Sequence, residues 1–291
     1  MTTEETAVQS LRAVDELTVR VVSENSVKAG VRGILGEHGY SAVLSAGGED
    51  VLFDTGQTGT VLANNLRVLQ LAPPGKVVLS HGHYDHSGGL LEYAKICPRN
   101  TPVYTQANAF RKRLKKVKGR LVDIGMPFAR RELVDAGFGI HESDAPQQVS
   151  EWLVTSGIIE RGSFERPETE FFIAEGSRSI KDPFLDDSAV AANVEGKGLV
   201  IVTGCAHAGV INTVRHFKRL LREDRIHAIV GGFHLVDASE EKMAKTIAAL
   251  EELDPSCIIP GHCTGRGAAH ALKEAFKERV VFCKVGLKKV F

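Results

Sequence analysis

The sequence has no excess of charge of either sign and no long apolar stretch. Its 36 lysines and arginines balance its 36 aspartates and glutamates, so no net field attracts nucleic acid or a membrane surface. The residues from Met1 to Glu5 are polar and acidic, and no apolar run long enough for a signal peptide or a membrane span follows them. We therefore expect a cytoplasmic protein that binds neither nucleic acid nor membranes.

Paired cysteines are also missing. The five cysteines are odd in number and form no Cys-x-x-Cys pair: Cys97, Cys205, Cys257, Cys263 and Cys283. This pattern favours reduced thiols over a disulfide framework. Hydrophobic residues make up 43% and charged residues 25% of the 291 residues, which is typical of a globular protein with a large core. The length allows one domain that carries an insertion.

The sequence does contain a dense group of metal-ligand residues. Three histidines and one aspartate lie close together: His81, His83, Asp85 and His86. The apolar run Val77–Leu79 in front of them predicts a buried strand that ends in a loop. Imidazoles and carboxylates bind first-row divalent metals, and a short loop can turn alternate side chains toward one point. We interpret the segment as a metal site rather than as a surface loop that is rich in histidine.

Three later histidines also follow predicted strands, at residues 199–202, 226–230 and 257–260. His207 lies between a strand and the N-terminus of a helix, which favours a metal ligand over a helix-terminal hydrogen-bonding role. His234 follows the glycine pair at 231–232, where the backbone can approach a ligand closely. His262 follows the last of the three strands. Together with the first loop, four strand ends therefore present imidazoles.

The remaining pattern predicts alternating strands and helices. Antiparallel strands are predicted at 17–22, 41–46 and 50–53, and helices at 58–71, 90–96, from Ser239 to Pro255, and 268–278. A last strand is predicted at 280–283, and we expect the basic tail behind it to be solvated.

One stretch, residues 111–120, is strongly basic. One interpretation is a solvated helix face. The other is a lid whose lysines and arginines bind a phosphate group of the substrate, with Arg113 as the candidate phosphate ligand. Residues 121–185 are irregular and suit an insertion that covers the site. We predict a single domain, 1–291, with a cap insertion at about 106–185. Glu37 and His38 precede a predicted strand. They lie either in a solvated loop or near the site.

The spacing His81-x-His83-x-Asp85-His86 resembles the signature of the metallo-β-lactamase superfamily. Two other segments agree in chain order, since Leu52–Gly56 resembles its early strand-end motif and Ile258–His262 resembles its late histidine. The resemblance spans about residues 17–265. It implies an α/β (α+β) fold, an αββα sandwich that holds one or two divalent metals at one edge of two packed sheets. It also implies that Asp54 is a buried hydrogen-bonding anchor rather than a ligand.

The same resemblance implies two ligand sets. The first contains His81, His83 and a third histidine, and the second contains Asp85, His86 and His262. The chain departs from the family pattern before the strand at 199–202, because Asp186 and Asp187 stand where the third histidine ligand is usual. His207, after that strand, is therefore the candidate for the third ligand. Cys205 occupies the place of the usual bridging aspartate and is a further candidate ligand. We favour zinc, although manganese, iron, cobalt or magnesium also suits these ligands.

Four segments resemble one branch of the superfamily: Glu37–Gly39, Gly204–His207, Gly231–Leu235 and Pro260–Gly265. Its members are described as metal-dependent hydrolases. They include the methanogen enzyme that joins a dihydropterin methyl diphosphate to ribofuranosylaminobenzene 5′-phosphate and releases diphosphate. This resemblance implies a small anionic, phosphorylated substrate. It places Glu37, His38, Arg113 and Cys263 near the substrate, and Asp85 and His234 in catalytic roles.

Three classes of function follow from these residues. The first is a transferase of the dihydropterin type. The second is a hydrolase of a phosphate ester, a phosphodiester or a lactone, in which Asp85 orients the attacking water. The third is a non-catalytic metal-binding module, which the complete metal loop disfavours. Cys205 as a nucleophile lacks an evident general base.

Overall fold

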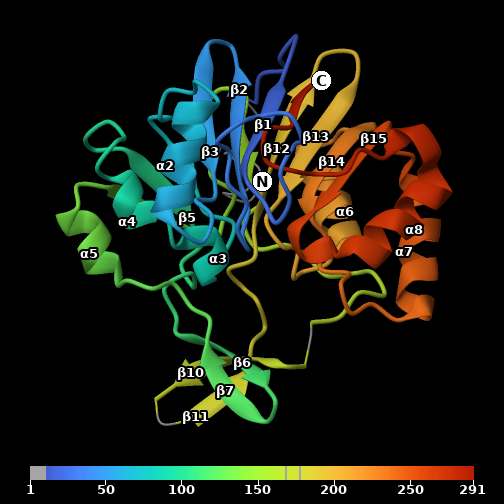
Figure 1. Ribbon diagram of the computed structural model, residues 1–291. Coiled ribbons are helices and arrows are strands. Elements are labelled where there is room, and N and C mark those ends of the chain that lie inside the picture. The colour runs from blue at the N-terminus through green and yellow to red at the C-terminus, as the bar shows by residue number, and fades with distance from the viewer. Residues whose placement is uncertain (1–10, 168, 177) are drawn as a thin grey trace.

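The computed structural model describes residues 11–167, 169–176 and 178–291. Two β-sheets face each other, and helices cover their outer faces (Figure 1). This is the αββα sandwich expected from the sequence. In the described part of the chain, no helix is both long and apolar enough to cross a bilayer.

The first sheet has seven strands in the order β16-β1-β2-β3-β4-β5-β8. Its strands are β1 (Thr18–Ser23), β2 (Ser41–Ala46), β3 (Glu49–Phe53), β4 (Val77–Val78), β5 (Pro102–Thr105), β8 (Gly139–Glu142) and β16 (Lys288–Val290). The strands from β16 to β3 are antiparallel, which confirms the predicted run at 17–53, and those from β3 to β8 are parallel. The loop that carries His81, His83, Asp85 and His86, called the metal loop below, follows β4, which is an interior strand of this sheet.

The second sheet has five strands in the order β15-β14-β13-β12-β9. They are β9 (Val154–Thr155), β12 (Ala189–Val194), β13 (Gly198–Thr203), β14 (Ile226–Gly232) and β15 (Cys257–Gly261). Strands β13, β14 and β15 are parallel. Because the carboxyl ends of parallel strands lie at one edge of a sheet, the segments that carry His207, His234 and His262 emerge side by side.

The core explains why these strands are apolar on both sides. In β13, Val200 and Val202 pack between the sheets, whereas Leu199 and Ile201 face the outer helices. A strand buried on both faces has no polar side to show, which is why its sequence is a continuous apolar run. The layers are therefore helix, sheet, sheet and helix.

Helices complete the two outer layers (Figure 1). The first sheet is covered by α2 (Gly59–Val68), α4 (Leu90–Tyr93) and α5 (Arg130–Asp135), and the second by α6 (Val210–Leu221), α7 (Glu240–Leu253) and α8 (Arg266–Phe276). The short helix α3 (Tyr84–Ser87) lies in the metal loop, and 3-10 turns occupy η1 (His262–Thr264) and η2 (Lys277–Arg279). The predicted helix that starts at Ser239 is confirmed as α7, and Ser239 caps it because its side chain accepts a hydrogen bond from the Lys242 N–H.

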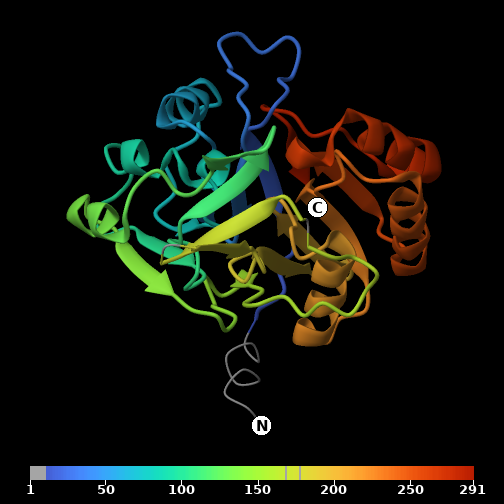
Figure 2. The ribbon, with the colours of Figure 1, turned by 90° about the horizontal axis from the view of Figure 1, so that it is seen from below.

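A small four-stranded sheet lies apart from the sandwich, beyond the end where α3 is found (Figures 1 and 2). Its order is β11-β10-β6-β7, with β6 (Arg113–Val117), β7 (Arg120–Asp123), β10 (Phe171–Glu175) and β11 (Arg178–Lys181). We call these two hairpins the cap sheet. The insertion expected at 106–185 is thus only partly a cap, since α5, β8 and β9 belong to the main layers.

Two predictions of secondary structure are wrong. The basic stretch 111–120 is not a helix face but part of the β6–β7 hairpin, and its turn at Lys118 and Gly119 has φ values of 48° and 79°, as a two-residue hairpin turn requires. Residues 280–283 form only an isolated bridge between Ile258 and Val280.

The tail beyond residue 283 is also not simply solvated, because β16 pairs with the edge strand β1. Phe291 is buried in the core between the sheets. Pairing covers the free edge of β1, so a segment with exposed basic side chains still forms a strand.

Candidate metal centre

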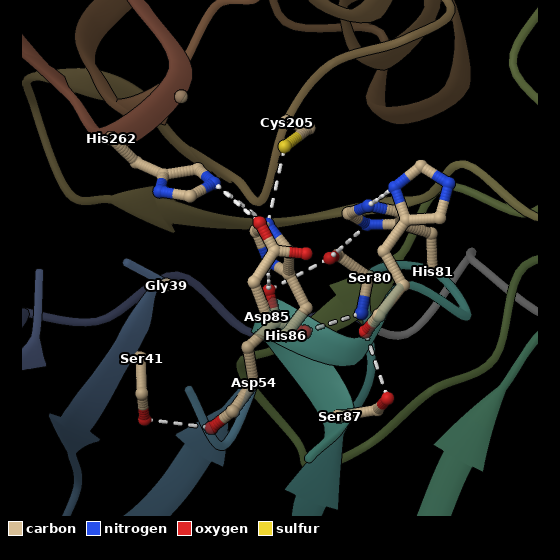
Figure 3. A network of polar contacts seen from close by, with 12 residues as sticks. Gly39, Ser41, Asp54, Ser80, His81, Asp85, His86, Ser87, Cys205 and His262 are labelled. Carbon is tan, nitrogen blue, oxygen red and sulfur yellow. Dashed lines mark hydrogen bonds and ion pairs between the residues drawn. The ribbon is translucent and has the colours of Figure 1, made fainter. Parts of the chain in front are cut away.

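One buried carboxylate holds the metal loop in place. Asp54 follows β3 with a left-handed φ of 57° and is fully buried. Its Oδ1 accepts a hydrogen bond from the Ser80 N–H at 2.7 Å. Its Oδ2 accepts from Ser80 Oγ and contacts His86 Nδ1, both at 2.7 Å (Figure 3). Asp54 therefore orients the loop from outside the ligand sets.

Hydrogen bonds at Nδ1 determine which nitrogen of three histidines faces the centre. Ser80 Oγ donates to Asp54, so it accepts from His81 Nδ1, which lies 2.8 Å away. His86 Nδ1 donates to Asp54, and His262 Nδ1 donates to Asn25 Oδ1 at 3.1 Å. In all three residues Nε2 is thereby the nitrogen that faces the centre, the arrangement of metal-bound histidines.

The first ligand set contains His81, His83 and His207, whose ligand atoms all lie within 4.8 Å of one another. His81 Nε2 and His83 Nδ1 are 2.9 Å apart. Within the part of the chain that is described, His83 Nε2 and both ring nitrogens of His207 are buried without a hydrogen-bond partner. Buried polar atoms almost always have a partner, so these nitrogens fit a metal ion.

The second ligand set contains Asp85, His86 and His262. Asp85 Oδ2 is 3.3 Å from His262 Nε2 and 3.9 Å from His86 Nε2, and the two Nε2 atoms are 3.1 Å apart. Figure 3 shows the three side chains pointing toward one another from α3 and from the end of β15. One carboxylate with two imidazoles is a donor set that suits a divalent cation.

Electrostatics distinguish the two sets. Burial holds the pKa values of His81, His83 and His207 well below the usual range, and neighbouring imidazoles add to the effect. These three imidazoles are therefore neutral near pH 7. Neutral imidazole is the form that binds a metal.

The second set carries opposite charges. Burial acts to lower the pKa of His86, but attraction to Asp54 and Asp85 outweighs it and raises that pKa to about 9. Burial acts to raise the pKa of Asp85, yet His86 and His262 hold it well below its usual range. A cation that binds here displaces the His86 proton, since ligands must be deprotonated.

Cys205 lies between the two sets. Its Sγ is 3.1 Å from His86 Nε2 (Figure 3), and His81, His86 and Cys205 together have their ligand atoms within 4.8 Å. Cys205 is the residue that the family resemblance places at the position of the usual bridging aspartate, and it stays a candidate ligand. Burial raises the pKa of Cys205, and the neighbouring Cys263 raises it further.

Asp186 and Asp187 support the loops rather than facing the centre. Asp186 Oδ2 accepts from the Gly82 N–H at 2.8 Å, and Asp187 Oδ2 accepts from the Ala208 N–H at 2.8 Å. Each carboxylate thereby fixes the loop beside a first-set histidine. His207 is the histidine that completes the first candidate ligand set.

Two residues expected near the substrate have structural contacts instead. Arg113 is buried and pairs through Nε with Asp182 at 3.2 Å and through Nη2 with Asp186 at 2.6 Å. Its charge is neutralised there, so it cannot meet a substrate phosphate. Glu37 accepts from Ser23 Oγ and from the N–H groups of Gln57 and Thr58, so its carboxylate holds the loop in front of α2.

His38, His234 and Cys263 lie beside the ligand sets. His38 is half-exposed, and its Nε2 is 3.2 Å from Asp85 Oδ2; that hydrogen bond raises the His38 pKa against the opposing effect of burial. The His234 ring lies 4.4 Å from the His207 ring, centroid to centroid. Cys263 is half-buried beside Cys205.

Sequence reasoning missed the aromatic wall of the site. Phe184 stacks on His207 with ring centroids 4.2 Å apart, and Phe171 of β10 stacks on His83 at 5.8 Å. Lys115 of β6 makes a cation–π contact with the same Phe171 ring, with its Nζ 4.9 Å from the ring centroid. The basic stretch was the only signal for Lys115, and the irregular segment around the two phenylalanines gave none.

Comparisons with known proteins agree with this geometry. The metallo-β-lactamase superfamily profile matches residues 35–262. A protein of Methanocaldococcus jannaschii, the 7,8-dihydropterin-6-methyl-4-(β-D-ribofuranosyl)-aminobenzene-5′-phosphate synthase, is 30% identical over 254 residues, which cover 83% of this chain and 86% of that protein. An uncharacterized protein of the same archaeon is 32% identical over 240 residues, or 82% and 88% of the two chains.

Solved structures are similar as well. One described as a metal-dependent hydrolase of the β-lactamase superfamily has a TM-score of 0.80 and 28% identity, and the match covers 94% of this chain and 98% of that one. A metallo hydrolase from Ignicoccus hospitalis has a TM-score of 0.53 and 12% identity over 95% and 98% of the two chains. The second likeness concerns the fold alone.

Proposed function

The chain belongs to the metallo-β-lactamase superfamily of metal-dependent enzymes, and from this premise we propose that it displaces a phosphate or diphosphate group from a small phosphorylated substrate. The observation that carries the proposal is the pair of buried ligand sets at one edge of the sandwich. His81, His83 and His207 would hold one divalent ion, and Asp85, His86 and His262 a second. Such ions neutralise the negative charge of a departing phosphate group.

The leading candidate reaction is a transfer that releases diphosphate. In it, the amine nitrogen of ribofuranosylaminobenzene 5′-phosphate attacks the methylene carbon of a dihydropterin methyl diphosphate. The carbon–oxygen bond breaks, the electron pair leaves with diphosphate, and the amine gives up one proton. The similarity to the synthase of M. jannaschii, across most of both chains, supports this choice.

Residues of the chain supply binding and orientation in this scheme. We propose that Lys115, whose Nζ lies over the Phe171 ring, pairs with a phosphate group, the role expected of Arg113. Phe171 and Phe184 cover the first ligand set and exclude water from it. We propose that His234, whose ring lies 5.9 Å from that of Phe171, orients the substrate beside the first ligand set.

A hydrolase of a phosphate ester, a phosphodiester or a lactone is the second candidate. It is favoured by the likeness to the solved metal-dependent hydrolase. The contact between half-exposed His38 and Asp85 also suits it, because this pair could orient a water molecule beside the second ligand set. In this reaction water replaces the amine as the nucleophile.

The test follows diphosphate release from 6-hydroxymethyl-dihydropterin diphosphate, with protein loaded in turn with zinc, manganese and magnesium. Each assay is run with and without ribofuranosylaminobenzene 5′-phosphate. Release that requires the amine supports the transferase, and release that ignores it supports hydrolysis. No release with any metal rejects both reactions of this substrate and directs the search to other phosphodiesters and to lactones.

Two histidine variants control the assay. His83→Ala removes a first-set ligand and should abolish release. His141→Ala changes an exposed histidine on β8 that stacks on Tyr104, and it should keep wild-type activity. Equal activities of the two variants would show that the reaction does not depend on the proposed metal centre.

A further inference from the structure

Three side chains with nitrogen or sulfur donors gather beside the two ligand sets. Cys205, His234 and Cys263 follow β13, β14 and β15, and their ligand atoms all lie within 4.8 Å of one another. Cys205 is buried, and the other two are half-buried. Neighbouring parallel strands end at the same edge of the sheet, so residues far apart in the sequence meet there.

The backbone makes room for this sulfur pair. Gly232, the last residue of β14, has no side chain, and a Cβ at that position would lie 2.6 Å from Cys263 Sγ and 3.3 Å from Cys205 Cα. The Gly232 N–H is instead bonded to the Gly204 carbonyl at 3.0 Å. Cys263 Sγ approaches the Cys205 carbonyl to 3.5 Å. Only glycine at 232 lets both thiols approach each other.

We propose that Cys205, His234 and Cys263 form a third metal site, rich in sulfur, for a thiophilic divalent ion such as zinc. Thiolates are soft ligands that favour zinc, copper or iron over magnesium and manganese. Two thiolates and one imidazole provide three protein ligands, and a tetrahedral ion keeps its fourth position open. Both sulfurs bind the ion as thiolates, and the imidazole binds it in its neutral form.

The site is contiguous with the centre already described. Cys205 Sγ lies 3.1 Å from His86 Nε2, so this thiolate is shared between the sulfur-rich site and the second ligand set. The His234 ring lies 5.9 Å from the ring of Phe171 in the cap sheet, so the cluster lies close to the cap. The proposal concerns metal binding only and does not depend on which reaction the protein catalyses.

The test measures metal ligation directly. Fully reduced protein is loaded with zinc, its five thiols having been counted before loading, and zinc content and X-ray absorption are recorded. Sulfur neighbours scatter at about 2.3 Å and nitrogen or oxygen neighbours at about 2.0–2.2 Å. We expect a sulfur shell in wild type, reduced by about half and with one zinc equivalent lost in Cys263→Ser.

Cys257→Ser is the matched control, because Cys257 is a buried cysteine at the start of β15, and it should keep the wild-type zinc content and sulfur shell. A Cys263→Ser protein that also keeps both would overturn the proposal. Cobalt-loaded wild type provides a measurement that needs no variant. Thiolate-to-cobalt charge-transfer absorption in the near ultraviolet is expected, and its absence overturns the proposal even if a variant fails to fold.

Discussion

Single side chains decide the tautomers and charges of the centre. Asp54 accepts hydrogen bonds from both the Ser80 N–H and His86 Nδ1. Asn25 accepts a hydrogen bond from His262 Nδ1. Partners of this kind orient a ligand and typically change metal affinity about 10–100-fold when they are removed. The ligands are therefore positioned by residues that do not touch the metal.

Lys115 is the residue to change for substrate charge. Lys115→Ala should raise KM about tenfold with a smaller change in kcat, because a charge-assisted contact contributes about 1.5–3 kcal/mol. Steady-state kinetics with the phosphorylated substrate measure this effect. Lys116→Ala is the control, since Lys116 is exposed and the next side chain of a strand points to the opposite face. Equal KM values for the two variants would contradict the assignment.

Glu165 should give stability a pH dependence. Its carboxylate accepts from the N–H groups of Ile211 and Asn212 in the first turn of α6, but burial, the larger effect, raises its pKa. Because the folded pKa is above the unfolded value of about 4.3, the contribution is fully present below that value. It is lost as the pH rises through the folded pKa.

Urea unfolding at pH 5 and pH 8 measures this effect. Wild type should lose more stability between the two pH values than Glu165→Gln, which cannot ionise. Glu160→Gln, which changes an exposed partner of Arg219, is the control and should follow wild type. Parallel pH profiles of wild type and Glu165→Gln would refute the prediction.

At the scale of elements, one arginine joins the cap sheet to the metal loop. Arg113 begins β6 and pairs with Asp186, whose other oxygen accepts from the Gly82 N–H. Gly82 has no room for a side chain, because a Cβ there would lie 1.9 Å from the Ala109 carbonyl oxygen. Asp186 therefore connects the start of the cap sheet to the loop that carries His81 and His83.

Replacing Arg113 should damage both stability and metal binding. Arg113→Ala leaves the buried carboxylates of Asp182 and Asp186 without their cation, which costs about 3–5 kcal/mol. Arg113→Lys should rescue little, because an ammonium lacks the planar fork that reaches both carboxylates. Denaturant unfolding and zinc content measure the two effects, with Lys112→Ala, on an exposed residue next to it, as control. An Arg113→Lys protein as stable as wild type would contradict the role of the guanidinium in pairing with both carboxylates.

At the scale of the whole molecule, the metal centre joins the two sheets. The first loop follows β4 in one sheet, and His207 and His262 follow β13 and β15 in the other. Without a cation, the buried nitrogens of His83 and His207 have no partner among the described residues. An ion bound there would stabilise the contact between the two halves of the sandwich.

Removing metal should lower the melting temperature. Binding at about a thousandfold excess over Kd stabilises a protein by about 4 kcal/mol, and for a chain of this size each kcal/mol corresponds to about 2–4 °C. We expect chelated protein to melt about 10 °C lower by calorimetry and to recover when zinc is restored. Protein carrying His83→Ala should respond less to the chelator. An unchanged melting temperature would show that the ligand sets bind no metal.

Local patterns in the sequence determined the layers and half of the centre. The apolar runs at 77–79 and 199–202 predict buried strands because a strand covered on both faces has no polar side. His81, His83, Asp85 and His86 could be named as candidate ligands because they are neighbours in one loop. Asp54 could be named as an anchor only through the family resemblance.

Tertiary structure alone decided the rest, because the deciding contacts join residues far apart in the chain. The burial of Arg113 depends on Asp182 and Asp186, and the sequence around it shows only a basic stretch. The tail became a strand because β1 offered a free edge. Cys205, His234 and Cys263 meet only because β13, β14 and β15 are parallel neighbours, an arrangement that no local pattern records.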